Sequence, residues 1–239
     1  MKGAPRLLEQ AAEPILRPVD TFRTVLGREL TLAYRRPADF LNPLFFFLVV
    51  TSLFPVAISP LKETLMLIGP GVLWIAVLLS ALLPLSTHYG QDFDDGTLEQ
   101  YLLSGQSLVA ICIAKTVALW LVAGLPLVLA SLVVASSYGL GPTVFATLSI
   151  TLAAGSYALC ALGAVAAALT VGMQRASALI ALLVLPLMVP VLIFGTQAVS
   201  LEATNMVSKG PMYLVLAVTG LAATLCPLAT AAALRISME

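Results

Sequence analysis

Charged residues are scarce in this chain of 239 residues: Asp, Glu, Lys and Arg make up 10% of it, whereas apolar residues make up 60%. Soluble domains carry roughly 25% charged residues. Because so few charges cannot cover a water-exposed surface, most of the chain must face lipid or other buried helices. The twelve basic residues are balanced by twelve acidic ones, so the basic face that nucleic-acid binding requires is lacking. We therefore expect an integral membrane protein with no nucleic-acid partner.

Residues and motifs that commonly bind metals or carry catalysis are also rare. The three cysteines, Cys112, Cys160 and Cys226, are far apart in apolar stretches, which is typical of small buried side chains rather than ligands. The sequence contains no G-x-x-x-x-G-K-[ST], H-E-x-x-H or G-x-S-x-G pattern. We therefore expect no catalytic residue, no metal site and no cofactor bound by this chain alone.

Six stretches are long and apolar enough to cross a membrane, which takes roughly 20 residues of helix. Because backbone polar groups in lipid must be paired internally, and the alternating pattern of a β-barrel is absent, these stretches should be helices. The predicted fold is therefore all-α, with a single six-helix transmembrane domain over residues 38–239. The expected spans are residues 40–59, 65–88, 108–135, 144–171, 178–200 and 211–234.

The basic residues of the short connections are unevenly distributed between the two ends of these spans. Only Lys62 and Lys209 fall on one side. The other side holds Lys2, Arg6, Arg17, Arg23, Arg28, Arg35, Arg36, Arg175 and Arg235. Since cytoplasmic connections carry the excess of Lys and Arg, both termini are expected in the cytoplasm.

Residues 1–37 are expected to form a cytoplasmic N-terminal segment with no signal peptide. Within it, residues 17–36 predict an amphipathic helix that Pro37 ends. Its apolar stripe consists of Val19, Phe22, Leu26, Leu30 and Ala33. Such a helix fits a position on the anionic lipid surface of the cytoplasmic leaflet. Packing against the bundle is an equally weighted alternative.

A stripe of small residues in the fourth span favours close approach of another helix. It consists of Ser156, Cys160, Ala164 and Ala168. The neighbour could belong to the same bundle or to a second copy of the chain, so a homodimer is one alternative.

The connection at 89–107 differs from every other because it holds four acids and no Lys or Arg. Asp95-Gly96 is a turn signal, and Thr97 with Gln100 predicts a capping box at the start of a short helix. We expect this helix to dock into a groove on another protein rather than to be a solvated loop. The expected contact residues are Asp92, Asp94, Asp95, Thr97, Leu98, Glu99, Gln100, Tyr101 and Leu102.

Two further polar residues lie close to this connection. Lys115 is the only basic residue within a span, and intramembrane charge is a functional hypothesis by default. Two alternatives stay open: its amine reaches the interface, or it pairs with Asp92, Asp94 or Glu99. His88, the only histidine, is a candidate haem contact. An ordinary interfacial histidine is the favoured interpretation.

Taken in order, several short motifs resemble the haem exporter protein B (CcmB) family from about Thr21 to Ser237. They are Arg28-Glu29-Leu30, Asn42-Pro43-Leu44, Leu53-Phe54-Pro55, Pro70-Gly71, Asp95-Gly96-Thr97-Leu98-Glu99-Gln100, Ala114-Lys115, Gly124-Leu125-Pro126-Leu127, Leu185-Pro186-Leu187 and residues 233–237. Residues 1–20 have no counterpart in the pattern, and residues 86–90 lack the charges expected there.

The resemblance implies an ABC-2-type exporter-like bundle in the bacterial inner membrane. This chain would be the permease subunit of the cytochrome c maturation transporter and not itself an enzyme. ATP would bind a separate cytoplasmic ATPase, into which residues 92–103 would dock as a coupling helix. Further partners would be a haem-handling membrane subunit, a small single-span subunit and a periplasmic haem chaperone. Haem could be exported, or the haem-loaded chaperone released. The alternative is an ABC exporter of another lipid-like or glycan substrate.

Overall fold

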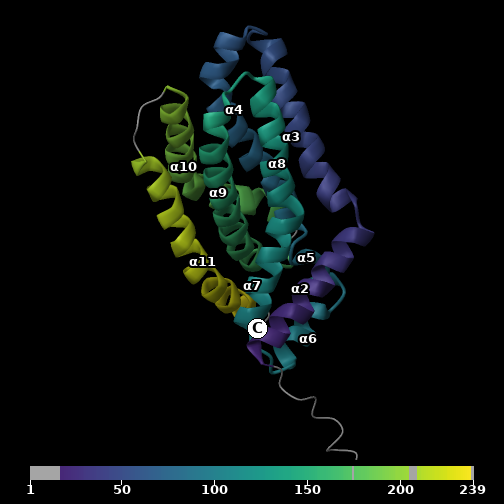
Figure 1. Ribbon diagram of the computed structural model, residues 1–239. Helices are drawn as coiled ribbons and strands as arrows, with labels where there is room; N and C mark the ends of the chain where they lie inside the picture. Colours follow the sequence, from purple (N-terminus) through teal and green to yellow (C-terminus); the bar gives the residue numbers. More distant parts are fainter. Residues whose placement is uncertain (1–16, 174, 205–208, 238–239) are drawn as a thin grey trace, which may run out of the picture.

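Apolar helices running along one long axis dominate the molecule (Figure 1). The computed structural model describes residues 17–173, 175–204 and 209–237. The regular structure of these residues is helical, which confirms the all-α prediction. The long helices are α3 (Ala38–Ala57), α4 (Lys62–Leu82), α7 (Leu108–Leu119) continued by α8 (Leu125–Ser137), α9 (Pro142–Leu169), α10 (Ala176–Ala203) and α11 (Gly210–Ser237).

Among the described residues, five helical stretches are long and apolar enough to cross a membrane. The apolar part of α3, Leu41–Ala57, is shorter. The first described residues and the end of α11 lie at the same end of the bundle (Figure 1), as an even number of crossings requires. These features establish an α-helical membrane protein, while the count of six spans and the cytoplasmic termini stay predictions.

Two of the predicted spans have a more complex course than hydropathy indicated. Where residues 65–88 were expected to form one span, α4 ends at Leu82 and a 3₁₀ turn, Leu83–Ser86, follows. Where 108–135 were expected, the helix contains a π-helical turn, Trp120–Gly124, just before Pro126. Proline lacks the N–H that would continue the α-helical ladder, so a local change of winding there is physically reasonable.

Close packing between helices holds the centre of the bundle. Helix α9 packs against α8, α10 and α11. Its small-residue stripe is buried within the chain, with Ser156 and Ala168 2% and 0% exposed. This supports the first alternative, a neighbour within the same bundle. The Trp74 ring fits against Gly155 and Gly195, where added Cβ atoms would come within 2.5 and 2.1 Å of it.

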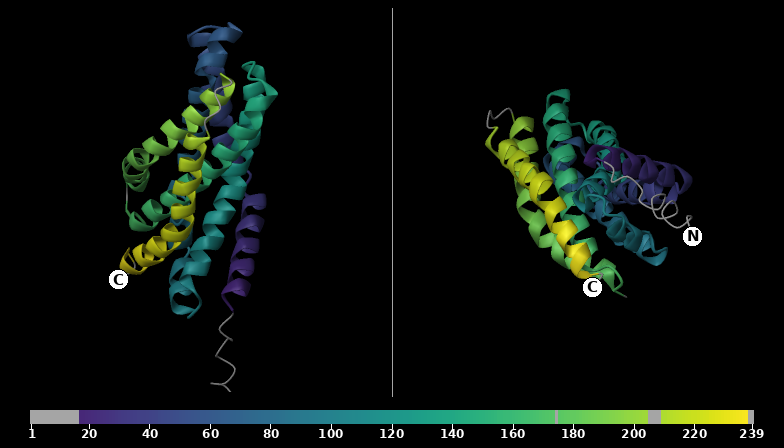
Figure 2. Two further views of the ribbon diagram at one scale, coloured as in Figure 1. Left: turned by 60° about the vertical axis from the view of Figure 1, so that its left-hand side comes forward. Right: turned by 90° about the horizontal axis from the view of Figure 1, so that it is seen from below.

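The predicted N-terminal helix is α2 (Pro18–Arg35), which runs beside α7 (Figures 1 and 2). Phe22 and Leu26 of the predicted stripe pack against the core, and the neighbouring Val25 is buried. Val19 and Leu30 of the same stripe are 60% and 38% exposed. The middle of the apolar stripe thus covers the bundle, which supports the alternative of bundle packing. Contact with lipid stays a prediction, and residues 1–16 lie outside the described residues.

Candidate functional site: a charged network beneath a short acidic helix

The predicted docking connection forms two short helices, α5 (Gly90–Asp94) and α6 (Thr97–Leu103). The helix itself confirms the prediction, but its capping box was wrong. Gly96 has a φ of 74° and precedes the helix, so Thr97 is its first residue and makes no cap hydrogen bond. The backbone N–H of Thr97 instead donates to Asp95 Oδ1 at 3.0 Å. Hydrogen bonding from Thr97 lowers the pKa of Asp95, and a carboxylate there suits the helix start.

The apolar face of α6 is turned toward the bundle. Leu98 is 1% exposed, and Tyr101 and Leu102 pack against the core. The side of α6 that can meet another protein therefore differs from the expected one. Asp94, Asp95, Glu99 and Gln100 are exposed. So is Leu103, at 86%, which the sequence analysis did not include. The exposed surface is acidic with one large apolar side chain, and we call these five residues the acidic surface.

Asp92 does not belong to the acidic surface, because it is buried beneath it. Its Oδ2 lies 2.6 Å from Lys115 Nζ. The exposed fractions of the two side chains are 7% and 2%. Lys115 therefore pairs with one of the three acids proposed for it and does not reach toward water. The other two candidates, Asp94 and Glu99, are exposed.

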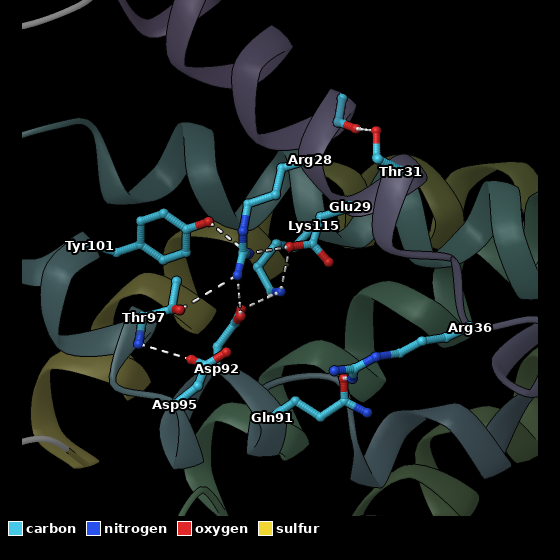
Figure 3. A network of polar contacts seen from close by, with 11 residues as sticks. Arg28, Glu29, Thr31, Arg36, Gln91, Asp92, Asp95, Thr97, Tyr101 and Lys115 are labelled. Atoms are coloured by element: carbon cyan, nitrogen blue, oxygen red, sulfur yellow. Dashed lines mark hydrogen bonds and ion pairs between the residues drawn. The ribbon is translucent and has the colours of Figure 1, made fainter. Parts of the chain in front are cut away.

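Two residues of α2 complete a charged network around this pair (Figure 3). Glu29 Oε1 accepts hydrogen bonds from Lys115 Nζ at 3.1 Å and from Arg28 Nη1 at 2.9 Å. Arg28 Nη2 in turn donates to Asp92 Oδ1 at 3.1 Å. Two cations and two anions are thus joined in a closed ring, and we call these four residues the charged network.

Aromatic and hydroxyl groups surround the two cations. Arg28 Nη1 donates to the Tyr101 hydroxyl at 3.0 Å, and its Cζ lies 5.8 Å from the centre of that ring. Lys115 Nζ lies 5.4 Å from the centre of the Tyr89 ring. Burial opposes the charge on Arg28, but Asp92, Tyr101 and Glu29 together raise its pKa. The pKa of Tyr101 is raised by burial. The arrangement keeps Arg28 charged and Tyr101 protonated.

The charged network ties three separate parts of the chain together. Its members come from α2, α5 and α7, and Tyr101 adds α6. Two outer contacts support the same junction: Arg36 donates to Gln91, and Thr21 Oγ1 donates to Gln106 Oε1 at 3.0 Å. Removing one partner of a buried ion pair leaves an uncompensated charge and costs about 3–5 kcal/mol. A displacement of α5 and α6 should therefore carry α2 and α7 with it.

His88 lies beside the charged network but outside it. Its Nε2 is buried and has no partner among the described residues, and its ring meets Tyr89 edge-on at 4.5 Å. The cavity next to it measures about 90 Å³, whereas pockets that enclose a whole drug-sized ligand measure roughly 300–1,000 Å³. Within the described part of the chain, no cluster of three His, Cys, Asp or Glu residues could hold a metal ion. A haem contact at His88 stays a prediction.

Sequence reasoning missed the two network residues on α2. From the sequence, Arg28 contributed only to the count of basic residues. Arg28 and Glu29 together appeared only in a family motif. The available signal was that Glu29 is an acid in an otherwise basic helix, whose only other acid is Asp20. No local spacing connects residues 86 positions apart, as Glu29 and Lys115 are.

Comparison with known proteins identifies the chain at the level of a family. The family model described as CcmB protein matches residues 20–237. The chain belongs to the CcmB family. It is 43% identical to heme exporter protein B of Pseudomonas aeruginosa over 92% of this chain and 98% of the relative. It is 42% identical to heme exporter protein B of Escherichia coli strain K12 over 91% and 99%.

A further relative, heme exporter protein B of Haemophilus influenzae, is 43% identical over 91% of this chain and 99% of its own length. The charged network and the acidic surface both lie inside the matched range. CcmB membership together with the five long apolar helices makes the chain a multi-pass membrane protein with a role in transport, as expected for the bacterial inner membrane.

Proposed function

We propose that this chain couples ATP hydrolysis by a separate ABC ATPase to a haem-handling step in cytochrome c maturation. Family membership supports a haem-export membrane subunit, because relatives are named heme exporter protein B. The finer proposal rests on one observation: the acidic surface is joined by the charged network to α2 and α7. A partner that moves α6 would thereby move helices of the bundle.

The contact with the ATPase is assigned to the acidic surface, with Leu103 as its apolar anchor. Leu103 is 86% exposed at the end of α6, about one helical turn after the exposed Glu99. An exposed large apolar side chain next to charged ones is typical of a protein-interaction site. ATP would remain on the partner, since this sequence carries no phosphate-binding loop. A conformational change of that partner acts here only if its states contact α6 differently.

The closed centre of the bundle favours the release of a haem-loaded periplasmic chaperone over passage of haem through this chain. A cavity of about 400 Å³ lies toward one end of the bundle, near Pro70, Leu140 and Ser200, but it does not continue through the centre. At the centre of the bundle, between Trp74 and Met188, the cavity measures about 10 Å³. Ligand pockets measure roughly 300–1,000 Å³. In this role the helices transmit motion to a haem-handling membrane subunit and a small single-span subunit. Export of another lipid-like or glycan substrate is the runner-up, and CcmB membership disfavours it.

Charge reversal on the acidic surface tests the contact. The double variant Glu99→Arg with Leu103→Arg should reduce co-purification of the ATPase about tenfold or more, while membrane insertion and folding stay unchanged because both side chains are exposed. The matched control is Leu61→Arg with Glu63→Arg, which makes the same changes on exposed residues at the opposite end of the bundle. Undiminished co-purification, or an equal loss in the control, would contradict the proposed contact.

The haem content of the periplasmic chaperone tests whether this chain acts at release of the chaperone or at haem export. In cells lacking this chain, we expect haem-loaded chaperone to accumulate without mature c-type cytochromes. An empty chaperone would instead place the step at haem export. Normal levels of mature cytochromes would remove the role in cytochrome c maturation altogether.

A further inference from the structure

A cavity of about 90 Å³ lies between α2, α5 and the α7 segment that ends in the π-helical turn. Its polar wall contains Glu29, Arg36, His88 and Gln91. Its apolar wall contains Leu32, Ala33, Pro84, Leu119, Val122 and Ala123. In Figure 3, Glu29 lies on one side together with Lys115, and Arg36 with Gln91 lies on the other. The cavity thus presents a carboxylate and a guanidinium to the same space.

The depth of this cavity matches the headgroup region of a bilayer. The span Leu108–Ser137 has 30 residues. At about 1.5 Å per residue, it is about 45 Å long. The hydrocarbon core is about 30 Å thick, so about 7 Å of helix extends beyond it at each end. Lys115 lies about 10 Å along the helix from Leu108. The polar end of the cavity, beside Lys115, therefore lies where acyl chains give way to headgroups, and its apolar wall continues deeper, to Ala123.

Several polar side chains around the cavity have hydrogen-bonding atoms that make no described contact. Glu29 uses Oε1 for both Arg28 and Lys115, and no described contact involves its Oε2. The guanidinium of Arg36 donates only through Nη1, to Gln91, among the described contacts. His88 Nε2 is buried and has no partner within the described residues. Buried polar groups are rarely left unpaired, yet this His88 nitrogen, at a residue that lines the cavity, lacks a described partner.

The guanidinium on one side of the cavity and the carboxylate on the other indicate which class of ligand would bind there. A guanidinium binds phosphate through paired hydrogen bonds, and a carboxylate with a free oxygen accepts from an ammonium. A group that offers both charges a few ångströms apart is a phosphoethanolamine. The apolar wall of Leu32, Leu119 and Val122 would accompany the first carbons of attached acyl chains. A purely anionic headgroup fits less well, because Glu29 and Asp92 already balance the charges of Arg36 and Lys115 on the lining.

We infer that this cavity binds the headgroup of a phosphatidylethanolamine lipid, with its phosphate on Arg36 and its ammonium on Glu29. His88 then completes its hydrogen bonding with the phosphate. A lipid held here bridges α2 to α7 on the outer side of the charged network. This assignment concerns lipid binding alone and does not depend on the proposed coupling to an ATPase.

Native mass spectrometry of the full chain in detergent micelles tests the inference. Phosphatidylethanolamine, phosphatidylcholine and phosphatidylglycerol with identical acyl chains are added in turn. We expect phosphatidylethanolamine to bind with the highest affinity, because the methylated amine of phosphatidylcholine cannot donate to Glu29. Equal binding of all three lipids would mean contact with acyl chains only, and preference for phosphatidylglycerol would mean an anion site. Either result would overturn the assignment.

Two variants that leave the charged network intact sharpen this test. Arg36→Gln removes the phosphate partner and should weaken phosphatidylethanolamine binding about tenfold or more, since hydrogen bonds between two charged groups are stronger than those between neutral ones. Arg35→Gln is the matched control, because Arg35 is an exposed neighbour that does not line the cavity. Ala33→Leu should fill the cavity and abolish the preference. A preference that survives both Arg36→Gln and Ala33→Leu would refute the site.

Soluble phosphoethanolamine distinguishes the two sources of this headgroup. We expect it to compete with the lipid only at concentrations at least tenfold higher, because it lacks the acyl carbons that would meet the apolar wall. Competition at equal concentration would identify a soluble ligand and exclude a lipid site.

Discussion

The centre of the bundle and the end that carries α5 and α6 are held together by different forces. At the centre, small residues of α9 and two glycines around Trp74 bring helices into van der Waals contact. At the end, the charged network joins α2 to α5 and α7. Lipid tails are as apolar as Leu, so apolar helices gain no hydrophobic driving force from meeting in a membrane. Tight packing therefore holds the centre.

Close packing and ion pairs also differ in how much movement of the helices they allow. Close packing tolerates little displacement, because interiors are packed as densely as organic crystals. Ion pairs are directional and can exchange partners when a partner protein shifts one element. The difference indicates that the bundle centre acts as a rigid body, whereas the charged network is the joint through which motion of α6 enters it.

Removing the central cation should have the largest effect. Lys115→Met removes the more deeply buried of the two cations that Glu29 and Asp92 share and leaves them only Arg28 among the described contacts. We expect the free energy of unfolding to fall by about 3–5 kcal/mol. The measurement is unfolding in mixed detergent micelles with increasing SDS. Lys62→Met, an exposed site, should change it by less than about 0.5 kcal/mol. If both variants lose equally little, the charged network does not stabilise the junction.

Adding a side chain at Gly195, beside Trp74 at the centre of the bundle, should have an intermediate effect on stability. In Gly195→Ala the new Cβ would lie 2.1 Å from Trp74 Cζ2, which forces the ring or the helix to move. We expect a loss of about 1–3 kcal/mol from overpacking. Gly220→Ala is the control, since nothing lies within 4 Å of its added Cβ. Combining Gly195→Ala with Trp74→Leu should give a non-additive gain, and strict additivity would show that the two sites do not touch.

Replacing the guanidinium of Arg28 by a single amine should have the smallest effect on stability. Arg28→Lys keeps the positive charge but cannot reach Glu29, Asp92 and Tyr101 together. We expect a loss of about 1 kcal/mol in the same unfolding assay. Arg23→Lys on an exposed turn of α2 is the control. An equal change in both variants would show that the geometry of Arg28 contributes nothing.

Much of the helical framework followed from hydropathy. The predicted stretches 144–171, 178–200 and 211–234 correspond to α9, α10 and α11 within a few residues. The turn at Asp95-Gly96 also correctly placed the start of a short helix. The capping group was wrong because the helix begins one residue earlier than the pattern indicated: Gly96 precedes it, and Asp95 Oδ1 accepts from the backbone N–H of Thr97.

The candidate site was only partly predictable. An acid partner for Lys115 could be expected, because an unpaired intramembrane charge is costly. Which acid it is depends on helix orientation: Asp92 is turned into the bundle and Asp94 is exposed, although both belong to α5. The inward turn of Leu98 likewise changed which side of α6 is available to a partner.

The sequence by itself determined that this chain is a bundle of apolar helices with a short acidic helix between two of them. That information is local, because lipid requires each spanning segment to satisfy its own backbone hydrogen bonds. Only the tertiary structure decided that Arg28, Glu29, Asp92 and Lys115 form one network. Side chains far apart along the chain meet only after the helices have chosen their neighbours and rotations, and that choice depends on the packing of the whole bundle.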